Sequence, residues 1–136
     1  IHPKKDVIAM QKTPTGQTAF DNEIFFPIRH DGKPMSGHSN HFRRMRWDKP
    51  SRTLTQNNGV MSSLACVHPG KTLRAGDESK RLYSDARSFS IKELFTIFSI
   101  NFENKVDPNT SQVFLRRIAG EGIPPLLVKE LFRSIV

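Results

Sequence analysis

The stretch Ser90-Ile-Lys-Glu-Leu-Phe-Thr-Ile-Phe98 combines a helix start with one continuous apolar face. Ser90 and Glu93 form a capping-box pattern, in which the serine hydroxyl accepts from the amide of residue 93 and the glutamate reaches back. Apolar residues fall at i, i+3, i+4 and i+7 of one helical face: Ile91, Leu94, Phe95 and Phe98. Burying four such side chains contributes roughly 1.5–3 kcal/mol each. We therefore predict a helix over 90–98 whose apolar face belongs to the core.

Two further helices are predicted downstream. Asp107-Pro-Asn-Thr110 is a start signal for a short helix over 111–118, with Phe114, Leu115 and Ile118 facing inward. A tight turn at 119–122 should follow, and Pro124-Pro125 then fits the start of a last helix. The apolar stripe of this last helix consists of Leu127, Leu131 and Ile135. We expect an apolar face, either on 90–98 or on the last helix, to remain partly uncovered.

Upstream of residue 87 the chain is predicted to form short strands and loops. Apolar segments between turn signals indicate strands at 7–10, 24–28 and 64–67. Asn58-Gly59 predicts a hairpin turn between strands at 53–55 and 60–61, whereas the charged segment 70–80 is predicted to be a loop. At 136 residues the chain is long enough for one domain with a core. The predicted fold class is α+β: a small mixed domain with short antiparallel strands and loops followed by C-terminal helices.

The charge balance favours a polyanionic partner. Lys and Arg number 21 against 13 Asp and Glu, which gives a net charge of +8. Nucleic acid is favoured over a membrane surface, because no apolar run is long enough to span a bilayer. The chain starts without Met or a signal-peptide pattern, so we expect a cytoplasmic piece of something longer. The single cysteine, Cys66, excludes an internal disulfide, and its apolar neighbours assign it to core packing rather than nucleophilic attack.

The candidate DNA-binding residues lie in the stretch from His41 to Gly59. Five cations are expected to contact phosphates, with one or two of them reaching a guanine: Arg43, Arg44, Arg46, Lys49 and Arg52. The residues that follow are candidates for base-edge or target-strand contacts: Thr53, Leu54, Thr55, Gln56, Asn57 and Asn58. The alternative reading of this stretch is a solvated basic turn leading into a hairpin, whose Thr residues merely suit strands.

Histidines near this stretch raise the question of a metal site. His38 and His41 have a spacing that occurs among zinc ligands, and His30 and Asp31 lie nearby in the sequence. Paired cysteines are absent and Asp31 is the only nearby carboxylate. We therefore expect polar loop histidines that can also touch phosphate, and no metal site.

Three segments in order resemble parts of a known family. Two of these segments resemble the last two sequence motifs of bacterial cytosine-5 DNA methyltransferases. The first is Arg87-Ser-Phe-Ser-Ile-Lys-Glu-Leu94, followed by Phe95 and Phe98, and the second is Ser111-Gln112, followed by Arg117 to Pro125. Upstream, Thr53-Leu54 resembles the Thr-Leu pair that closes the recognition loops of that family. His68-Pro69 has the expected place between this pair and the two downstream motifs. The resemblance covers roughly residues 40–136 and corresponds to the C-terminal portion of these enzymes.

The resemblance implies different roles for two parts of the chain. Residues 1–86 would be the target recognition region, and 87–136 a helical segment that packs on a catalytic domain missing from the chain. Double-stranded DNA would be the partner, in an enzyme of restriction-modification type. Under the same resemblance, Trp47 is expected to be a core or hinge aromatic rather than a base-stacking one. The resemblance thus predicts a sequence-specific DNA recognition module.

The cofactor and the chemistry of the family enter only through the full enzyme. Gly120, Glu121 and Gly122 match the motif beside the methionine end of S-adenosylmethionine, although Glu121 and Gly122 replace the usual Asn and Ala. The printed sequence contains no Pro-Cys-Gln nucleophile loop, no Glu-Asn-Val segment and no glycine-rich cofactor turn. The reaction needs a thiolate and an assisting carboxylate. We therefore expect the chain alone to be inactive and to bind no cofactor.

Two alternatives remain open at this point. In the first, the chain is the natural small subunit of a split cytosine-5 methyltransferase and becomes active only with its partner. In the second, it is a metal-dependent DNA-cleaving enzyme that uses His30, Asp31, His38 and His41.

Overall fold

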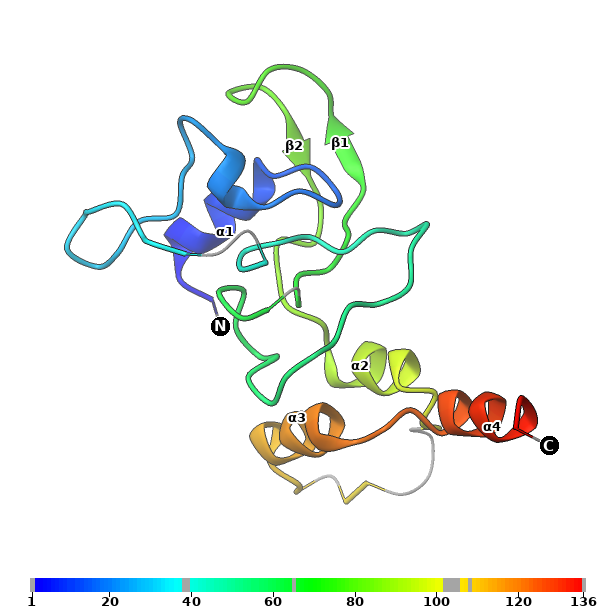
Figure 1. The fold of residues 1–136 in the computed structure, drawn as a ribbon. Helices are drawn as coiled ribbons and strands as arrows, with labels where there is room; N and C mark the ends of the chain where they lie inside the picture. The colour runs from blue at the N-terminus through cyan, green and yellow to red at the C-terminus, as the bar shows by residue number, and fades with distance from the viewer. Residues whose placement is uncertain (1, 38–39, 65, 102–105, 108, 136) are drawn as a thin grey trace.

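A computed structural model describes residues 2–37, 40–64, 66–101, 106–107 and 109–135. The elements follow in the order α1 (Lys4–Gln11), the 3-10 helix η1 (Ala19–Asp21), β1 (Thr72–Arg74), β2 (Leu82–Tyr83), α2 (Ile91–Ile97), α3 (Gln112–Glu121) and α4 (Pro125–Arg133). β1 and β2 pair antiparallel, with Thr72 opposite Tyr83. Figure 1 shows α1 and the β1–β2 hairpin at one end of the molecule and α2, α3 and α4 at the other. The predicted fold class, a small α+β domain with C-terminal helices, is confirmed.

Helix α2 forms the centre of the larger core cluster, as predicted. The Ser90 hydroxyl accepts from the Glu93 amide at 3.3 Å, and the Glu93 carboxylate accepts from the Ser90 amide at 2.8 Å, so the capping box is present. All four apolar residues of the predicted face are buried, together with residues from distant segments: Met45, Leu54, Cys66, Phe89, Leu115 and Ala119. The periodicity of this helix therefore identified the core correctly.

A second, smaller core cluster surrounds α1, where a strand was predicted. The segment 7–10 is helical, and its residues Ala9 and Met10 pack with Ala19, Phe42, Met61 and Val67. Pro3 precedes the helix with φ −56°, a conformation that suits a helix start. A four-residue apolar run has no periodicity that distinguishes a strand from one turn of a helix. The strand prediction was wrong for this reason.

In the part of the chain that the structure describes, none of the other predicted segments forms a strand. At 24–28, the Glu78 carboxylate accepts from the amides of Glu23, Ile24 and Phe25 at 2.8–2.9 Å. Residues 56–60 form turns rather than a paired hairpin, and the segment around Cys66 makes only isolated bridges. In the described part of the chain, the paired hairpin is β1–β2, most of which falls in the segment predicted to be a charged loop.

Arg44 is only 1% exposed, although it lies in the basic stretch. Its guanidinium donates to the carbonyl oxygens of Met10 (2.8 and 3.2 Å), His68 (2.8 Å) and Asp85 (3.2 Å). Burial lowers the pKa of Arg44 to about 10, which leaves it charged at neutral pH. The prediction that Arg44 contacts phosphate is therefore wrong, since its donors bind three backbone segments inside the protein.

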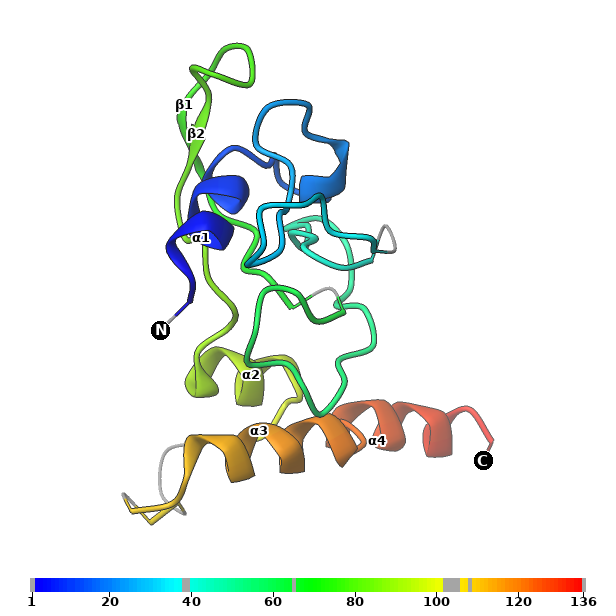
Figure 2. The ribbon, with the colours of Figure 1, turned by 90° about the vertical axis from the view of Figure 1, so that its left-hand side faces the viewer.

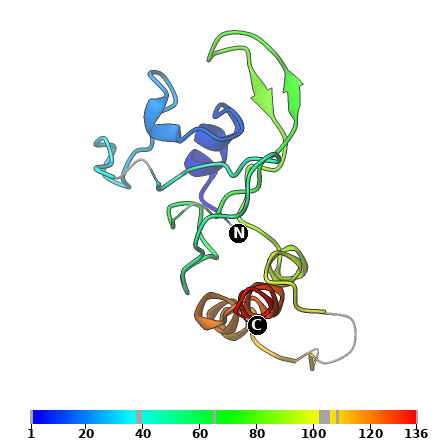
Figure 3. The same cartoon turned by 45° about the vertical axis from the view of Figure 1, so that its right-hand side comes forward.

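Helices α3 and α4 follow one another along the base of the molecule (Figure 2), and Figure 3 looks almost along this line. Helix α3 continues to Glu121, into the segment 119–122 that was predicted to be a turn, and it buries Leu115 and Ala119. Phe114 and Ile118, which were predicted to face inward, are 56% and 41% exposed. Helix α4 buries none of its residues, and Leu127, Leu131 and Ile135 are all more than half exposed. The expectation of an uncovered apolar face is thus met by the last helix.

Candidate nucleic-acid interface

The exposed cations of the candidate interface lie on the segment 46–52. Arg46, Lys49 and Arg52 are all exposed. The Arg46 guanidinium binds Asp48, with 2.8 Å between Nε and Oδ1, and Arg52 donates to Oδ1 of Asn40 at 2.6 Å. Arg43 is half-buried and donates to the Gly16 carbonyl at 2.6 Å. Three of the five predicted cations are therefore exposed in the structure.

The polar stretch that follows is divided between surface and interior. Thr53, Gln56 and Asn57 are exposed, and Thr55 is half-buried. Leu54 and Asn58 are buried, which removes them from the set of residues that can touch DNA. The side-chain amide of Asn58 donates to the Thr55 carbonyl at 2.8 Å and thereby closes the turn. The predictions for Leu54 and Asn58 were wrong, because one packs in the core and the other fixes the loop.

Helix α3 packs against the backbone of this polar stretch. The Arg116 guanidinium donates to the backbone carbonyls of Asn58 at 3.2 Å and Phe89 at 2.7 Å. The side-chain amide of Asn58 donates to the Arg116 carbonyl at 3.1 Å. Cavities of about 610 and 420 Å³ lie along the stretch, and both are lined by Thr55, Gln56 and Asn57. The exposed polar side chains are therefore presented on a fixed backbone with open space beside them.

Gly120, which the resemblance assigned to the cofactor, has a packing role in this structure. A Cβ atom at this position would lie 2.6 Å from backbone atoms of Thr55 and Gln56. Glu121 accepts from Nε of Arg117 at 2.9 Å, and Gly122 ends the helix. The absence of a side chain at position 120 allows α3 to approach the polar stretch closely.

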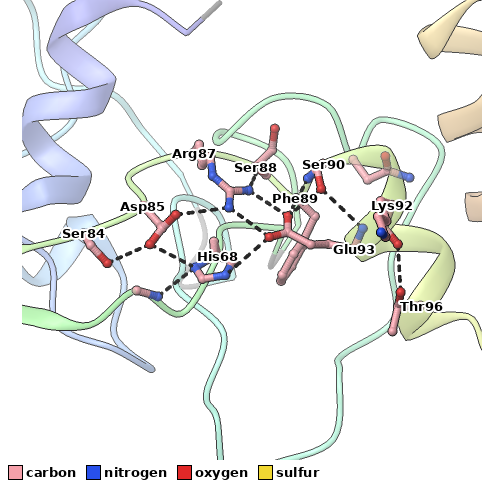
Figure 4. Close-up of polar contacts among 12 residues, drawn as sticks. His68, Ser84, Asp85, Arg87, Ser88, Phe89, Ser90, Lys92, Glu93 and Thr96 are labelled. Atoms are coloured by element: carbon pink, nitrogen blue, oxygen red, sulfur yellow. Dashed lines mark hydrogen bonds and ion pairs between the residues drawn. The ribbon is translucent and has the colours of Figure 1, made fainter.

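A cluster of charged side chains joins the end of β2 to the start of α2 (Figure 4). Arg87 binds the Glu93 carboxylate through both terminal nitrogens, at 2.7 and 2.9 Å, and lies 3.1 Å from Asp85. His68 lies 3.7 Å from Glu93 and 3.9 Å from Asp85. Arg87, Glu93 and His68 belong to the sequence motifs described above, whereas Asp85 lies in none of them. A contact between residues 68 and 93 has no periodic signal in the sequence.

The ionisation states in this cluster follow from its contacts. The paired Arg87 guanidinium, with help from Ser90, holds the pKa of Glu93 at about 2, and the Ser84 hydroxyl is the main cause of the lowered pKa of Asp85. Burial lowers the pKa of His68 despite the two nearby carboxylates. Nδ1 of His68 accepts from the Gly70 amide at 3.0 Å, which places the proton of the neutral ring on Nε2. The cluster is therefore a structural clasp with a neutral histidine, rather than an assembly with a nucleophile.

Replacing Glu93 with glutamine should weaken the clasp in a pH-dependent way. Because the folded-state pKa lies below the ordinary value of 4.5, the carboxylate stabilises the fold fully above about pH 4.5 and loses this effect toward pH 2. We expect the variant to be about 1–2 kcal/mol less stable near pH 6, after allowing for partial solvent exposure, and equal to wild type near pH 2. Urea unfolding at both pH values measures this difference, and a deficit that does not change with pH would contradict it.

The alternatives based on metal or thiol chemistry gain no support from the described residues. Cys66 is fully buried, as predicted for a core residue, and burial raises the pKa of its thiol to about 11. His38 lies outside the described residues. Within those that are described, no three His, Cys, Asp or Glu side chains gather in a way that could hold a metal ion. Thiolate attack by Cys66 is therefore inconsistent with its surroundings.

Comparison with known proteins relates the chain to one class of enzyme, the type II methyltransferases. The chain is 37% identical over 134 residues to Type II methyltransferase M1.HgaI of Avibacterium volantium. The similarity covers 98% of this chain and 36% of that protein, so the chain spans about a third of the relative's length. No protein-family model matches the chain, and no solved structure matches it.

None of the helices in the part of the chain that the structure describes is long and apolar enough to cross a membrane.

Proposed function

We propose that this chain is the DNA recognition module of a cytosine-5 DNA methyltransferase of restriction-modification type. The observation that carries the proposal is the similarity of nearly the whole chain to about a third of a type II methyltransferase. The net charge of +8 and the exposed cations Arg46, Lys49 and Arg52 supply a surface that a phosphate backbone can bind. Thr53, Gln56 and Asn57 supply donors and acceptors for base edges, and α3 packs against the backbone of this stretch at Thr55, Gln56 and Asn58.

The reaction itself belongs to the full enzyme in this proposal. The cytosine-5 chemistry needs a reactive thiolate, and the one cysteine of the chain is buried with a raised pKa. S-adenosylmethionine would supply the methyl group while bound to the rest of the enzyme, with the end of α3 near it. The exposed apolar side chains of α3 and α4 would then pack on the catalytic domain. Such a protein works in the cytoplasm, where DNA is modified.

Substitutions on the two parts of the surface should have different effects on DNA binding. Replacing Arg52 with alanine should weaken binding to all duplex sequences alike and lower the salt dependence of log K by about 1. Replacing Gln56 with alanine should leave the salt dependence unchanged and remove about 1–3 kcal/mol of discrimination between the preferred and a scrambled site. Fluorescence anisotropy with labelled duplexes across a salt series measures both quantities.

The same measurement contains its own control. Lys129 is exposed on α4, outside the proposed DNA-binding surface, and Lys129→Ala removes one positive charge without touching it. We expect this variant to bind like wild type. A loss of binding equal to that of Arg52→Ala would mean that net charge alone accounts for the affinity, and the proposed surface would then be wrong.

A further inference from the structure

A pocket of about 500 Å³ lies between the segment 45–51 and helix α2. Trp47 and Lys49 line one side, Lys92 and Thr96 line the helical side, and His68 belongs to the same lining. Figure 4 shows Lys92 and Thr96 close to the clasp, to which His68 itself belongs. A volume of this size and a largely apolar lining with a few polar groups are typical of sites for small organic ligands.

Trp47 is an exposed aromatic residue that the structure nevertheless holds in place. Trp47 is 62% exposed, so the core position, one of the two roles predicted for it, is not found, and the hinge role stays a prediction. The indole Nε1–H donates to the Gly70 carbonyl at 2.9 Å, and the ring meets His68 edge-on, with 5.4 Å between the centroids. The pocket thus contains a preorganised aromatic surface of the kind on which a planar ring can stack.

Gly70, whose carbonyl accepts the hydrogen bond from Trp47, is itself closely packed. Gly70 has φ +68°, and a Cβ atom there would lie 2.4 Å from Nη1 of Arg44 and 2.5 Å from the Ser84 carbonyl oxygen. Its amide donates to His68 at 3.0 Å. The carbonyl group that accepts from Trp47 therefore belongs to a closely packed turn.

The charges around the pocket are mainly positive. Lys49, Lys92 and Arg46 lie at its lining, and all three are exposed. The carboxylate of Glu93 also lines the pocket, but Arg87 binds both of its oxygens. Asp48 binds Arg46, which leaves Lys49 and Lys92 as the cations that face a ligand. A planar aromatic surface beside these ammonium groups fits a ligand that carries both a flat ring and a phosphate, which is a nucleotide.

We infer that this pocket binds one unstacked nucleotide of the DNA, with its base against Trp47 and its phosphate at Lys49 and Lys92. The inference rests on the proposed function and adds a site to it. A base inside a paired duplex is covered on both faces, so the pocket selects a nucleotide that is rotated out of the helix or unpaired. No bond is made or broken at this site, because binding alone is involved.

The single tryptophan of the chain makes the inference directly testable. The probes are a fully paired duplex and the same duplex with one extra unpaired nucleotide. We expect the unpaired nucleotide to quench Trp47 fluorescence and to tighten binding, whereas the paired duplex binds with little quenching. In Trp47→Ala the preference for the unpaired nucleotide should fall about tenfold or more, and in Trp47→Phe most of it should remain.

Two controls separate the possible outcomes. Lys49→Ala should reduce the preference for the unpaired nucleotide, whereas Lys71→Ala, an exposed cation outside the pocket, should not change it. Equal quenching by both probes, or an unchanged preference in Trp47→Ala, would overturn the inference while leaving duplex recognition intact. Failure of wild type to bind the paired duplex would instead contradict the proposed function.

Discussion

Replacing Arg44 with alanine should destabilise the protein more than any other single change on the basic stretch. The substitution removes the donors to the His68 carbonyl, which has no other donor among the bonds described, and one set of donors to the carbonyls of Met10 and Asp85, which still accept from the amides of Thr13 and Arg87. Loss of these hydrogen bonds, together with the cavity left by a large buried side chain, costs about 2–5 kcal/mol. With a typical urea dependence for a domain of this size, the unfolding midpoint should fall by about 2 M.

Two neighbouring variants show whether the buried hydrogen bonds are the cause. Arg46→Ala removes the same side chain from the surface, where it binds only the exposed Asp48 among the contacts described, and we expect its unfolding midpoint to match wild type. Arg44→Lys keeps the charge but loses the planar fork, so it should remain clearly destabilised. If Arg44→Ala unfolded at the wild-type midpoint, the role of Arg44 in joining the three backbone segments would be wrong.

Replacing Gly120 with alanine should destabilise the protein, although the same substitution within a helix usually does the opposite. Alanine is favoured over glycine in a helix by about 0.5–1 kcal/mol. Here the new Cβ would lie 2.6 Å from backbone atoms of Thr55 and Gln56, which cannot move away as a flexible side chain could. Such a steric conflict costs about 1–3 kcal/mol, so the net effect should be a loss of stability.

The Gly120 variant also links stability to DNA recognition. A displaced segment 55–57 should lose its preference for particular sequences while keeping its salt-dependent binding to any duplex. Gly122→Ala is the matched control, because Gly122 has an ordinary φ of −80° and its Cβ would lie 3.2 Å from the nearest atom. Thermal unfolding of both variants measures the effect, and a stabilised Gly120→Ala would show that α3 does not pack on this segment as described.

The sequence predicted the helical third of the protein well, because that part is governed by local rules. The capping box at Ser90 and the spacing from Ile91 to Phe98 are readable within nine residues, and the structure agrees with both. Pro124-Pro125 marked the start of α4 in the same way. The orientation of α3 was harder to predict, since Phe114 and Ile118 are apolar but remain exposed on a face that the described residues do not cover.

The first part of the chain could not be predicted from local patterns, because distant side chains hold it together. Glu78 binds amides more than fifty residues away, and Arg44 binds carbonyls up to 41 residues away. An arginine among other arginines gives no sign in the sequence that it is the buried one. The candidate DNA-binding set was therefore too large: Arg44, Leu54 and Asn58 belong to the interior, and only the structure separates them from their exposed neighbours.

The most direct test of DNA recognition by this chain is selection from a pool of random duplex DNA at two salt concentrations, followed by sequencing of the retained molecules. We expect a short motif to be enriched, to persist at the higher salt, and to disappear when Thr53, Gln56 and Asn57 are all replaced by alanine. These three side chains are exposed, so the variant should unfold at the wild-type midpoint. Retention without any enriched motif, or the same motif in the triple variant, would contradict sequence readout by this stretch.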